Sequence, residues 1–499
     1  MRWSLAVIAV ASQLLSPFAN VEARLIPHRS ITAGVKSSQA SNVVAAEFDQ
    51  LIDHSNPSLG TFKQRYWFNS DFYGDPGSPI ILESPGESTV NPKWIDPTES
   101  SITGLYASKV NGATVTLEHR YFGESQPFGS NSSTTALQHH TLNNAIQDLI
   151  YFANNVEFPF APNNSSKPQN APWVLVGCSY SGALAAWVNV LAPGTFWAYH
   201  CGSAVVETMS DFWLYFEPVK AALPKNCTTD YKRIVDHVNV VLANGTDTEK
   251  AALKTRFNSL NSTDAQFGEF MTGWFGNWQK QQLWDGYTKP FQTCDYIENR
   301  HPGSTFAQPG ADGVGLKMAL DGFERAVKSS WFPDDEFFSP ADGRSWDWLL
   351  CNEPFGWWQA YAKEDTTGLI PKAFTTAESI SESCASMFPD ENGFSYGLKL
   401  GRTEDQVNQK TGGWNHVNTK RLMWINGEFD PWRPATVSSV YRPGGPLEST
   451  KDAPVYLIPG AAHCNDFYPA NGNYNAVARK IFDDMVQNVV TWVNEFYFQ

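Results

Sequence analysis

Residues 171–187 read Ala-Pro-Trp-Val-Leu-Val-Gly-Cys-Ser-Tyr-Ser-Gly-Ala-Leu-Ala-Ala-Trp, and this stretch says most about the fold. Strand formers run up to Gly177, and small residues at helical spacing begin after Gly182. A strand, a sharp turn and a helix with Ser179 at the bend form the pattern of a nucleophile elbow. The pattern is imperfect, because Ser181 stands where a second glycine is usual. The alternative is an ordinary strand-to-helix turn with a serine as N-cap.

Two later segments share one form, an apolar run followed by a loop. Residues 421–432 read Arg-Leu-Met-Trp-Ile-Asn-Gly-Glu-Phe-Asp-Pro-Trp, and residues 454–466 read Pro-Val-Tyr-Leu-Ile-Pro-Gly-Ala-Ala-His-Cys-Asn-Asp. Asp430 and His463 each lie in the loop after a predicted strand. With Ser179 they stand in the chain order Ser, Asp, His that is typical of an α/β-hydrolase. We therefore predict a catalytic triad, although each residue alone would be read as a turn aspartate or a loop histidine.

The predicted triad assigns a role to each side chain. His463 would accept the proton of Ser179 and later give it to the leaving group. Asp430 would hold the imidazole in the right tautomer and stabilise the imidazolium. The oxyanion that forms on the substrate also needs preorganised hydrogen-bond donors, which the triad itself does not supply.

The length and charge of the chain exclude one class of partner. The chain has 499 residues, a formal net charge of −15 and a pI near 5.1. Its length is enough for a large core and more than one domain. Proteins that bind nucleic acid need a basic surface, so we expect no nucleic-acid partner.

The N-terminus has the form of an export signal. Residues 1–23 combine Arg2, an apolar run over 5–15 and a small residue, Ala23, at the end. This is typical of a signal peptide, and the apolar run is too short to span a membrane. Residues 24–45 are polar, small and basic, which indicates a flexible leader or propeptide. We expect a secreted protein without a membrane anchor, with a vacuolar or lysosomal location as the alternative.

The rest of the chain divides into two parts of one core and an insertion. Strands alternate with helices over 46–205, which predicts a mostly parallel sheet covered on both faces. Residues 206–415 instead show apolar residues at helical spacing and many tryptophans, which predicts a helical cap inserted into the core. The core resumes over 416–499. The expected strands are 65–68, 78–84, 113–118, 173–176, 197–202, 421–425 and 454–458, and a helix is expected over 142–156.

The seven cysteines allow three disulfides once the protein is exported. Local pairing would join Cys227 to Cys294 and Cys351 to Cys384 within the insertion. Cys178 and Cys201 lie on successive strands, which usually neighbour each other, so we expect a third bond between them. Cys464 would then carry the free thiol. The alternative is that Cys178 is an unpaired, buried small residue.

Six asparagines stand in the N-x-Ser/Thr pattern that accepts N-linked glycans. Such sites lie on the surface if they carry glycans, and two adjacent sites are rarely both used. Short patterns of this kind also occur by chance. The predicted glycosylation sites are Asn131, Asn163, Asn164, Asn226, Asn244 and Asn261.

Taken together, these motifs resemble one family of serine peptidases. The family comprises lysosomal Pro-X carboxypeptidase, dipeptidyl peptidase II and the fungal acid prolyl endopeptidases, and the match runs from about residue 48 to the C-terminus. Its fungal branch fits best, through Cys-Asn-Glu-Pro-Phe at 351–355. The markers are Gln-Arg-Tyr at 64–66, Pro-Gly-Glu at 85–87, Glu-His-Arg-Tyr-Phe-Gly at 118–123, Gly-Cys-Ser-Tyr-Ser-Gly at 177–182, Asn-Gly-Glu-Phe-Asp-Pro-Trp at 426–432 and Ala-His-Cys-Asn-Asp at 462–466.

The resemblance implies an α/β-hydrolase core with a helical cap and cleavage after proline. One departure is Cys178, because the family usually has glycine at this position. That departure concerns the local backbone of the elbow rather than the triad. We expect work at acidic pH, no metal and no cofactor.

The oxyanion donors follow from the fold. One is the backbone N–H of the residue after the nucleophile, Tyr180. The other is expected from the loop around Gly86 and Glu87, where glycine lets the backbone approach closely. The Glu87 carboxylate itself would either pair with a substrate amino terminus or fix this loop, and we favour the loop role.

A proline at the cleavage site needs a flat apolar slot that asks for no N–H from that residue. Trp432, two residues after Asp430, is expected to form one wall. Phe355, Trp357 and Trp358 from the insertion are candidates for the others, since aromatic faces contact a pyrrolidine ring over a large area. Packing within the cap is the alternative, and for the two tryptophans it has equal weight.

Two histidine clusters outside the triad lack the pattern of a metal site. His119 and Arg120 stand among Glu118 and Glu124, but one histidine beside carboxylates is not a clustered ligand set. We interpret them as a buried structural network under the active site. The pair at 139–140 lies in a polar stretch, and we expect it to be solvated.

Three functions compete. The first is a secreted serine peptidase that cleaves after proline through an acyl-enzyme, acts within proline-rich peptide chains, and works in acid; proline-specific exopeptidases are its variants. The second is an esterase or lipase on the same core, because a fold does not fix a substrate. The third is a binding protein on an inactive scaffold. The complete triad argues against the third, and the family markers argue against the second.

Overall fold

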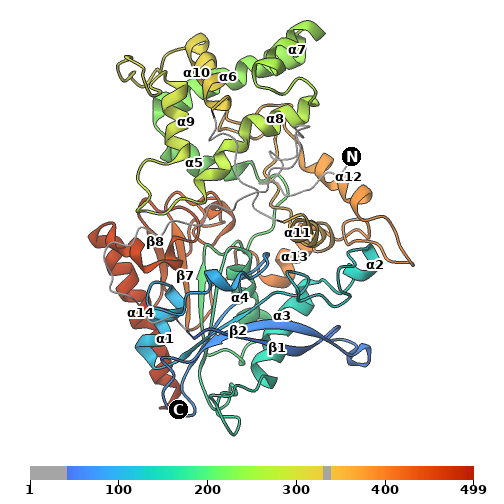
Figure 1. Cartoon of the computed structure of the whole chain (residues 1–499), viewed down its shortest axis with the longest axis vertical. Helices are drawn as coiled ribbons and strands as arrows, with labels where there is room; N and C mark the ends of the chain where they lie inside the picture. The colour runs from blue at the N-terminus through green and yellow to red at the C-terminus, as the bar shows by residue number, and fades with distance from the viewer. Residues whose placement is uncertain (1–41, 330–338, 499) are drawn as a thin grey trace.

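The computed structural model describes residues 42–329 and 339–498, which contain an eight-stranded sheet. In Figure 1 this sheet lies in the lower half of the molecule. The predicted signal peptide and most of the predicted leader lie outside the described residues. Along the sheet the order is β1-β2-β4-β3-β5-β6-β7-β8. The strands are β1 (Val44–Leu51), β2 (Thr61–Asn69), β3 (Ile80–Glu83), β4 (Ala113–Leu117), β5 (Trp173–Cys178), β6 (Ala198–Gly202), β7 (Leu422–Gly427) and β8 (Val455–Ile458).

The strand directions confirm the predicted α/β class. The neighbouring pairs from β4 across to β8 are all parallel, whereas β1 and β2 form an antiparallel hairpin at one edge. All seven expected strands are present. β1 was not expected, and it begins at Val44, inside the segment predicted as a leader. Its first residues are exposed or half-buried, so the apolar signal of a core strand is missing there.

Helices cover both faces of the sheet. α1 (Ile102–Val110) and α14 (Ala476–Phe496) pack on one face, and α3 (Leu142–Asn155) and α4 (Tyr180–Leu191) pack on the other. β5 serves both cores, because side chains alternate between faces along a strand. Val174 and Val176 point to the α1 and α14 side, and Trp173 and Leu175 point to the α3 and α4 side.

The described part of residues 206–415 contains helices and no strand of the sheet. In Figure 1 its helices α6 to α10 lie above the sheet, at the end where the parallel strands stop. The helices are α5 (Phe216–Ala222), α6 (Lys225–Asn244), α7 (Asp247–Arg256), α8 (Asp264–Thr272), α9 (Lys289–Ile297), α10 (Leu316–Val327), α11 (Pro340–Asn352), α12 (Ala377–Met387) and α13 (Glu404–Thr411). No helix in the described residues is long and apolar enough to cross a membrane.

Two of the three predicted disulfides are confirmed, and both lie in the cap. Cys227–Cys294 joins α6 to α9, and Cys351–Cys384 joins α11 to α12. All four of these cysteines are buried.

The third predicted disulfide is wrong, because Cys178 bonds to Cys464 and Cys201 is the free, buried thiol. The register of the sheet explains the error. Cys178 stands opposite Gly202, while Cys201 stands opposite Gly177. Since successive side chains point to opposite faces, the thiols of Cys178 and Cys201 lie on different faces of the sheet.

Five of the six predicted glycosylation sites are exposed: Asn131, Asn163, Asn164, Asn244 and Asn261. Asn226 differs from them. It is half-buried in the first turn of α6, next to the Cys227–Cys294 disulfide. A glycan there would meet the packed surface around it, so Asn226 is the least suited of the six.

Candidate active site

The elbow between β5 and α4 has the strained backbone that a nucleophile serine requires. Ser179 has φ 62° and ψ −129°, a backbone conformation that residues other than glycine rarely adopt. The neighbouring glycines make the turn possible. A Cβ on Gly177 would lie 2.2 Å from the backbone oxygen of Ser181, and one on Gly182 would lie 2.5 Å from that of Gly202. The strand and the helix therefore approach more closely than any larger residue allows.

Ser181, which replaces the usual glycine, closes this turn with its hydroxyl. Its Oγ accepts a hydrogen bond of 3.0 Å from the Cys178 N–H and donates one of 2.7 Å to the Cys178 carbonyl. The departure from the usual motif therefore adds a local brace to the elbow.

The acid and the base lie together, as the triad prediction requires. His463 Nδ1 is 2.9 Å from Asp430 Oδ1, which also accepts a hydrogen bond of 2.9 Å from the Trp432 N–H. Asp430 is fully buried, and the His463 side chain is 11% exposed. This arrangement fixes Nδ1 on the carboxylate and leaves Nε2 as the nitrogen that can exchange a proton.

The loop that carries His463 is tied down on both sides of the histidine. Asn465 accepts from the Ala462 N–H at 2.9 Å and donates to the carbonyl of Gln281 in the cap at 2.8 Å. One residue further on, the Asp466 carboxylate lies 2.7 Å from Nε2 of His200, a buried residue of strand β6. These contacts hold the base loop against both the core and the cap.

The expected oxyanion donors also lie at the elbow. Tyr180 is the first residue of α4, so its N–H has no acceptor within the helix. Gly86 has φ +76°, and a Cβ on it would lie 3.4 Å from Ser181 Cβ, which shows how closely this loop approaches the elbow. The loop is held by Glu118, whose Oε1 accepts from the Val90 N–H at 3.0 Å.

The residues around His119 form the buried network that the sequence indicated. Glu118 pairs with Arg65 at 2.5 Å, and Arg120 donates from Nε to Asp148 Oδ2 at 2.6 Å. His119 Nε2 lies 3.2 Å from the Tyr180 hydroxyl, so the network reaches the residue predicted to donate to the oxyanion. Burial lowers the pKa of His119 to about 4, which keeps its imidazole neutral in mild acid.

The prediction of a solvated pair at 139–140 is wrong for His140. This residue is fully buried, and its ring packs against those of His119, Tyr121 and Phe122. Burial lowers the pKa of His140 well below its usual value. A local polar sequence gave no sign of this, because the covering aromatic rings come from a different loop.

A cleft of about 360 Å³ opens at the triad. Its lining includes Ser179, His463 and Glu87 together with several aromatic side chains. Such a combination of an apolar wall and a few convergent polar groups is typical of a binding site for small molecules or peptides.

Trp432 places an aromatic ring beside the predicted base. Its ring stacks on Phe212 with centroids 5.4 Å apart and lies 6.1 Å from the His463 ring. Its Nε1 donates to Gln279 Oε1 at 2.8 Å. Stacking and the hydrogen bond fix the orientation of this wall.

Trp357 also lines the cleft, from the cap side. It has φ 55°, its N–H donates to the Met209 carbonyl at 2.6 Å, and its Nε1 donates to the Glu207 carbonyl at 2.7 Å. A tryptophan in this sparsely populated conformation persists only where its surroundings over-determine it.

The other two predicted pocket residues do not line the cleft. Phe355 stacks behind Trp357 at 4.9 Å, and Trp358 is 1% exposed within the cap. Sequence reasoning missed Trp346 and Tyr468, which do line the cleft. Trp346 stands six residues after the start of α11, and nothing in its local sequence distinguishes it from the other tryptophans of the insertion.

Two carboxyl groups lie in the cleft. Glu83 ends β3 and Glu87 lies in the loop that follows, and both line the cleft near Ser179. Desolvation raises the pKa of Glu83 to about 7. Desolvation likewise raises the pKa of Glu87 to about 7, against the opposing effects of its own backbone N–H and of His463. The raised pKa values favour the neutral forms of Glu83 and Glu87 in acid.

Comparison with known proteins agrees with this geometry. The model of the family "Serine carboxypeptidase S28" matches residues 50–295 and 322–479. Serine protease vicPb of Bipolaris victoriae is 36% identical over 484 residues, which cover 90% of this chain and 89% of the relative. "Probable extracellular serine carboxypeptidase" of Arthroderma benhamiae is 26% identical and is covered over 69% of its length, against 93% of this chain. The chain therefore belongs to the serine carboxypeptidase S28 family, and it is a serine peptidase with an α/β-hydrolase core.

Proposed function

We propose that the chain is a secreted peptidase that cleaves on the carboxyl side of proline, within proline-rich peptides, at acidic pH. Ser179 is the nucleophile, His463 the general base and acid, and Asp430 the residue that orients the histidine. The observation that carries the proposal is the position of Trp432, whose fixed ring stands 6.1 Å from the His463 ring and faces the same cleft.

The reaction follows from these positions. Ser179 Oγ attacks the scissile carbonyl while His463 Nε2 takes its proton. The N–H groups of Tyr180 and of the loop at Gly86 and Glu87 stabilise the oxyanion, an effect worth about 3–4 kcal/mol per donor. His463 then protonates the leaving amine, and a water molecule releases the acyl group by the reverse sequence.

The proline preference rests on the aromatic side of the cleft. Trp432 and Trp357 offer flat apolar faces, and a pyrrolidine ring fits between such faces without needing a donor of its own. A residue with a free N–H at this position would lose a hydrogen bond to water and gain none from the indole faces.

Action within a chain is supported by the charges in the cleft. An aminodipeptidase needs an anion for the substrate amino terminus, whereas desolvation raises the pKa of Glu83 and Glu87 to about 7 and so favours their neutral forms in acid. A carboxypeptidase needs a cation for the terminal carboxylate. Among the described residues, Lys280 is the lysine or arginine that lines the cleft, and this makes Pro-X carboxypeptidase action the second candidate.

A panel of matched substrates tests the proposal. Proline peptides with both ends blocked should be cleaved in acid at least as fast as peptides with one free end, and a p-nitrophenyl ester should be a poor substrate by comparison. Preference for a free carboxyl end would establish the carboxypeptidase instead. Preference for the ester over every peptide would point to an esterase.

Secretion is part of the proposal and has its own test. A host that exports the full chain should release a protein that begins after residue 23 or further along, with glycans at some of the exposed asparagines. Retention of residues 1–23 in the product, or accumulation inside the host, would contradict it.

A further inference from the structure

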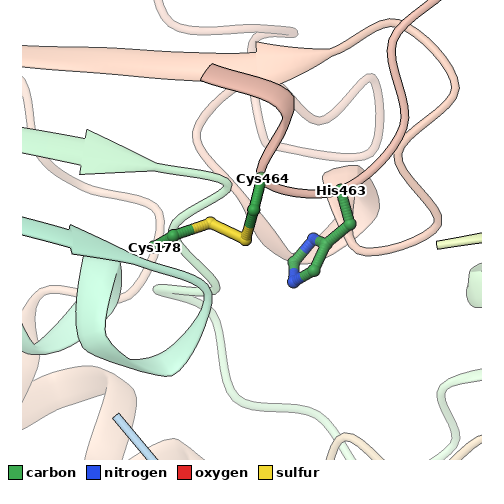
Figure 2. A group of neighbouring side chains, drawn as sticks. All are labelled: Cys178, His463 and Cys464. Carbon is green, nitrogen blue, oxygen red and sulfur yellow. A yellow bond between two sulfur atoms is a disulfide. The ribbon is translucent and has the colours of Figure 1, made fainter. Parts of the chain in front are cut away.

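The Cys178–Cys464 disulfide stands between the nucleophile and the base. Cys178 immediately precedes Ser179, and Cys464 immediately follows His463, although the two cysteines are 286 residues apart in the chain. Figure 2 shows the bond beside the imidazole of His463, with Cys178 at the end of its strand and Cys464 in the base loop. The two Cα atoms are 5.9 Å apart.

The sheet alone leaves the distance between the two catalytic loops poorly defined. The elbow follows β5 and the base loop follows β8, and β6 and β7 lie between these strands. The relative position of Ser179 and His463 therefore depends on loops rather than on directly paired strands. The disulfide is the covalent link that joins these loops at the residues next to the reacting groups.

Uncommon backbone conformations occur at one end of the bond and beside the other. Cys464 has φ 54°, and Ser179, which follows Cys178, has φ 62°. The Cys464 N–H donates to Ser203 Oγ at 3.1 Å, which adds a second tie to the same turn. Conformations of this kind persist when surrounding contacts impose them, so loss of the bond would let the turn at Cys464 relax.

This disulfide is also the one that solvent molecules can reach. Cys178 and Cys464 are half-buried and line the cleft, whereas the four cysteines of the two cap disulfides are at most 2% exposed. A small dithiol that enters the cleft would meet the sulfurs of Cys178 and Cys464 first, because thiol–disulfide exchange requires direct attack on a sulfur.

We propose that the Cys178–Cys464 bond is a positioning element that sets His463 against Ser179, and that a dithiol reductant which breaks it switches the enzyme off reversibly. The inference rests on the proposed roles of Ser179 and His463. In the reaction a thiolate of the dithiol attacks one sulfur, the mixed disulfide closes to the oxidised dithiol, and Cys178 and Cys464 are left as thiols. Two electrons and two protons pass from the dithiol to the protein, and an oxidant reverses the step.

Dithiothreitol treatment of the native full-length enzyme tests the proposal, with a chelator present. The chelator matters because the two sulfurs and a ring nitrogen of His463 lie within 4.8 Å of one another, and the freed thiols could trap a metal ion. Alkylation and peptide mapping report which cysteines are reduced. The rate at which a fluorophosphonate labels Ser179 reports the triad independently of any substrate preference.

We expect Cys178 and Cys464 to be alkylated together before the cap cysteines. Labelling of Ser179 should then slow by about 10- to 100-fold, since small misplacements of reacting groups cost rates of this order. Circular dichroism should stay unchanged, and reoxidation should restore the rate. An unchanged labelling rate with both thiols fully alkylated would overturn the proposal, as would a loss that follows reduction of the cap cysteines.

Paired variants make the same comparison without a reductant. Cys178→Ala/Cys464→Ala should lower kcat more than it raises KM and should make labelling insensitive to dithiothreitol. The control Cys227→Ala/Cys294→Ala should keep both the labelling rate and its sensitivity to dithiothreitol. If the first variant does not fold, the reduction of the native enzyme still decides. Absence of labelling in the untreated enzyme would instead refute the proposed function.

Discussion

The sheet core and the helical cap contribute different things to one cleft. The core supplies Ser179, Asp430 and His463 from turns that directly follow strands, so the geometry of each is set by a few neighbouring residues. The cap supplies Trp357 and Gln279, and these reach the cleft through packing between segments far apart in the chain. Short local segments therefore position Ser179, Asp430 and His463, and also Trp432 beside Asp430, whereas the cap side of the cleft depends on contacts between distant segments.

Ser179→Ala removes the contribution of the core and should have the largest effect. We expect activity to fall by about 10⁴-fold or more, because loss of a nucleophile removes the function of the whole triad. The melting temperature should change little, since Ser179 is not part of the packed core. Residual peptidase activity above this level, measured with purified protein, would place the nucleophile elsewhere.

Breaking a buried ion pair of the core should lower the free energy of unfolding far more than breaking an exposed ion pair of the cap. Arg120 is fully buried against Asp148, and Arg120→Met would leave that carboxylate without its main partner. We expect the free energy of unfolding to fall by about 3–5 kcal/mol.

Lys232→Met is the matched control for that change, because Lys232 pairs with Asp236 on the exposed face of α6 in the cap. This change should stay within about 0.5 kcal/mol. Chemical denaturation of both variants gives the comparison. Equal effects would mean that the core network contributes no more than a surface pair.

Trp432→Ala should change selectivity more than chemistry. We expect the ratio of kcat/KM for proline over alanine at the cleavage position to fall by about 10-fold or more, since burial of a ring of this size is worth about 1–3 kcal/mol. Trp358→Phe is the control, because Trp358 is buried in the cap and does not line the cleft. An unchanged ratio in Trp432→Ala would remove this residue from the substrate slot.

The buried carboxyls predict that the protein is more stable in acid than at neutrality. Desolvation raises the pKa of five glutamates from 4.5 to about 7: Glu83, Glu87, Glu207, Glu269 and Glu298. The folded state holds these protons more tightly than the unfolded state, so their contribution is complete below pH 4.5 and is lost as pH rises toward 7.

Buried histidines oppose this trend. Burial lowers the pKa of His119 and His416 to about 4, and it also lowers that of His140, so stability is lost as pH falls below about 6.5. The carboxyls are more numerous, and we expect a modestly higher melting temperature at pH 5 than at pH 7. Glu83→Gln should reduce that difference. A melting temperature that rises from pH 5 to pH 7 would contradict the balance.

The contrast between core and cap also explains what the sequence could and could not predict. A strand and the turn after it consist of contiguous residues, so two short segments were enough to predict that Asp430 pairs with His463. The aromatic wall was only half predicted, because the rotation of α11 and the turn at Trp357 decide which rings face the cleft. Those depend on long-range packing that no local pattern encodes.

The Cys178–Cys464 bond could have been predicted from local sequence, but the partner of Cys178 was predicted wrongly. Sheet neighbours suggested Cys201 as the partner, but the alternation of side chains along β5 and β6 separates the thiols of Cys178 and Cys201. A stronger signal was present in the sequence. If Ser179 and His463 must meet, then the cysteines next to them must also come close together.

We propose that a core triad cleaves chains at proline beside an aromatic wall that Trp432 of the core and Trp357 of the cap form together. The most direct measurement is mass spectrometry of the fragments that the purified enzyme makes from a long, unstructured, proline-containing polypeptide in mild acid, with Ser179→Ala as the blank. We expect new carboxyl ends at internal prolines and none in the blank. Fragments that end at residues other than proline, or release of terminal residues alone, would contradict it.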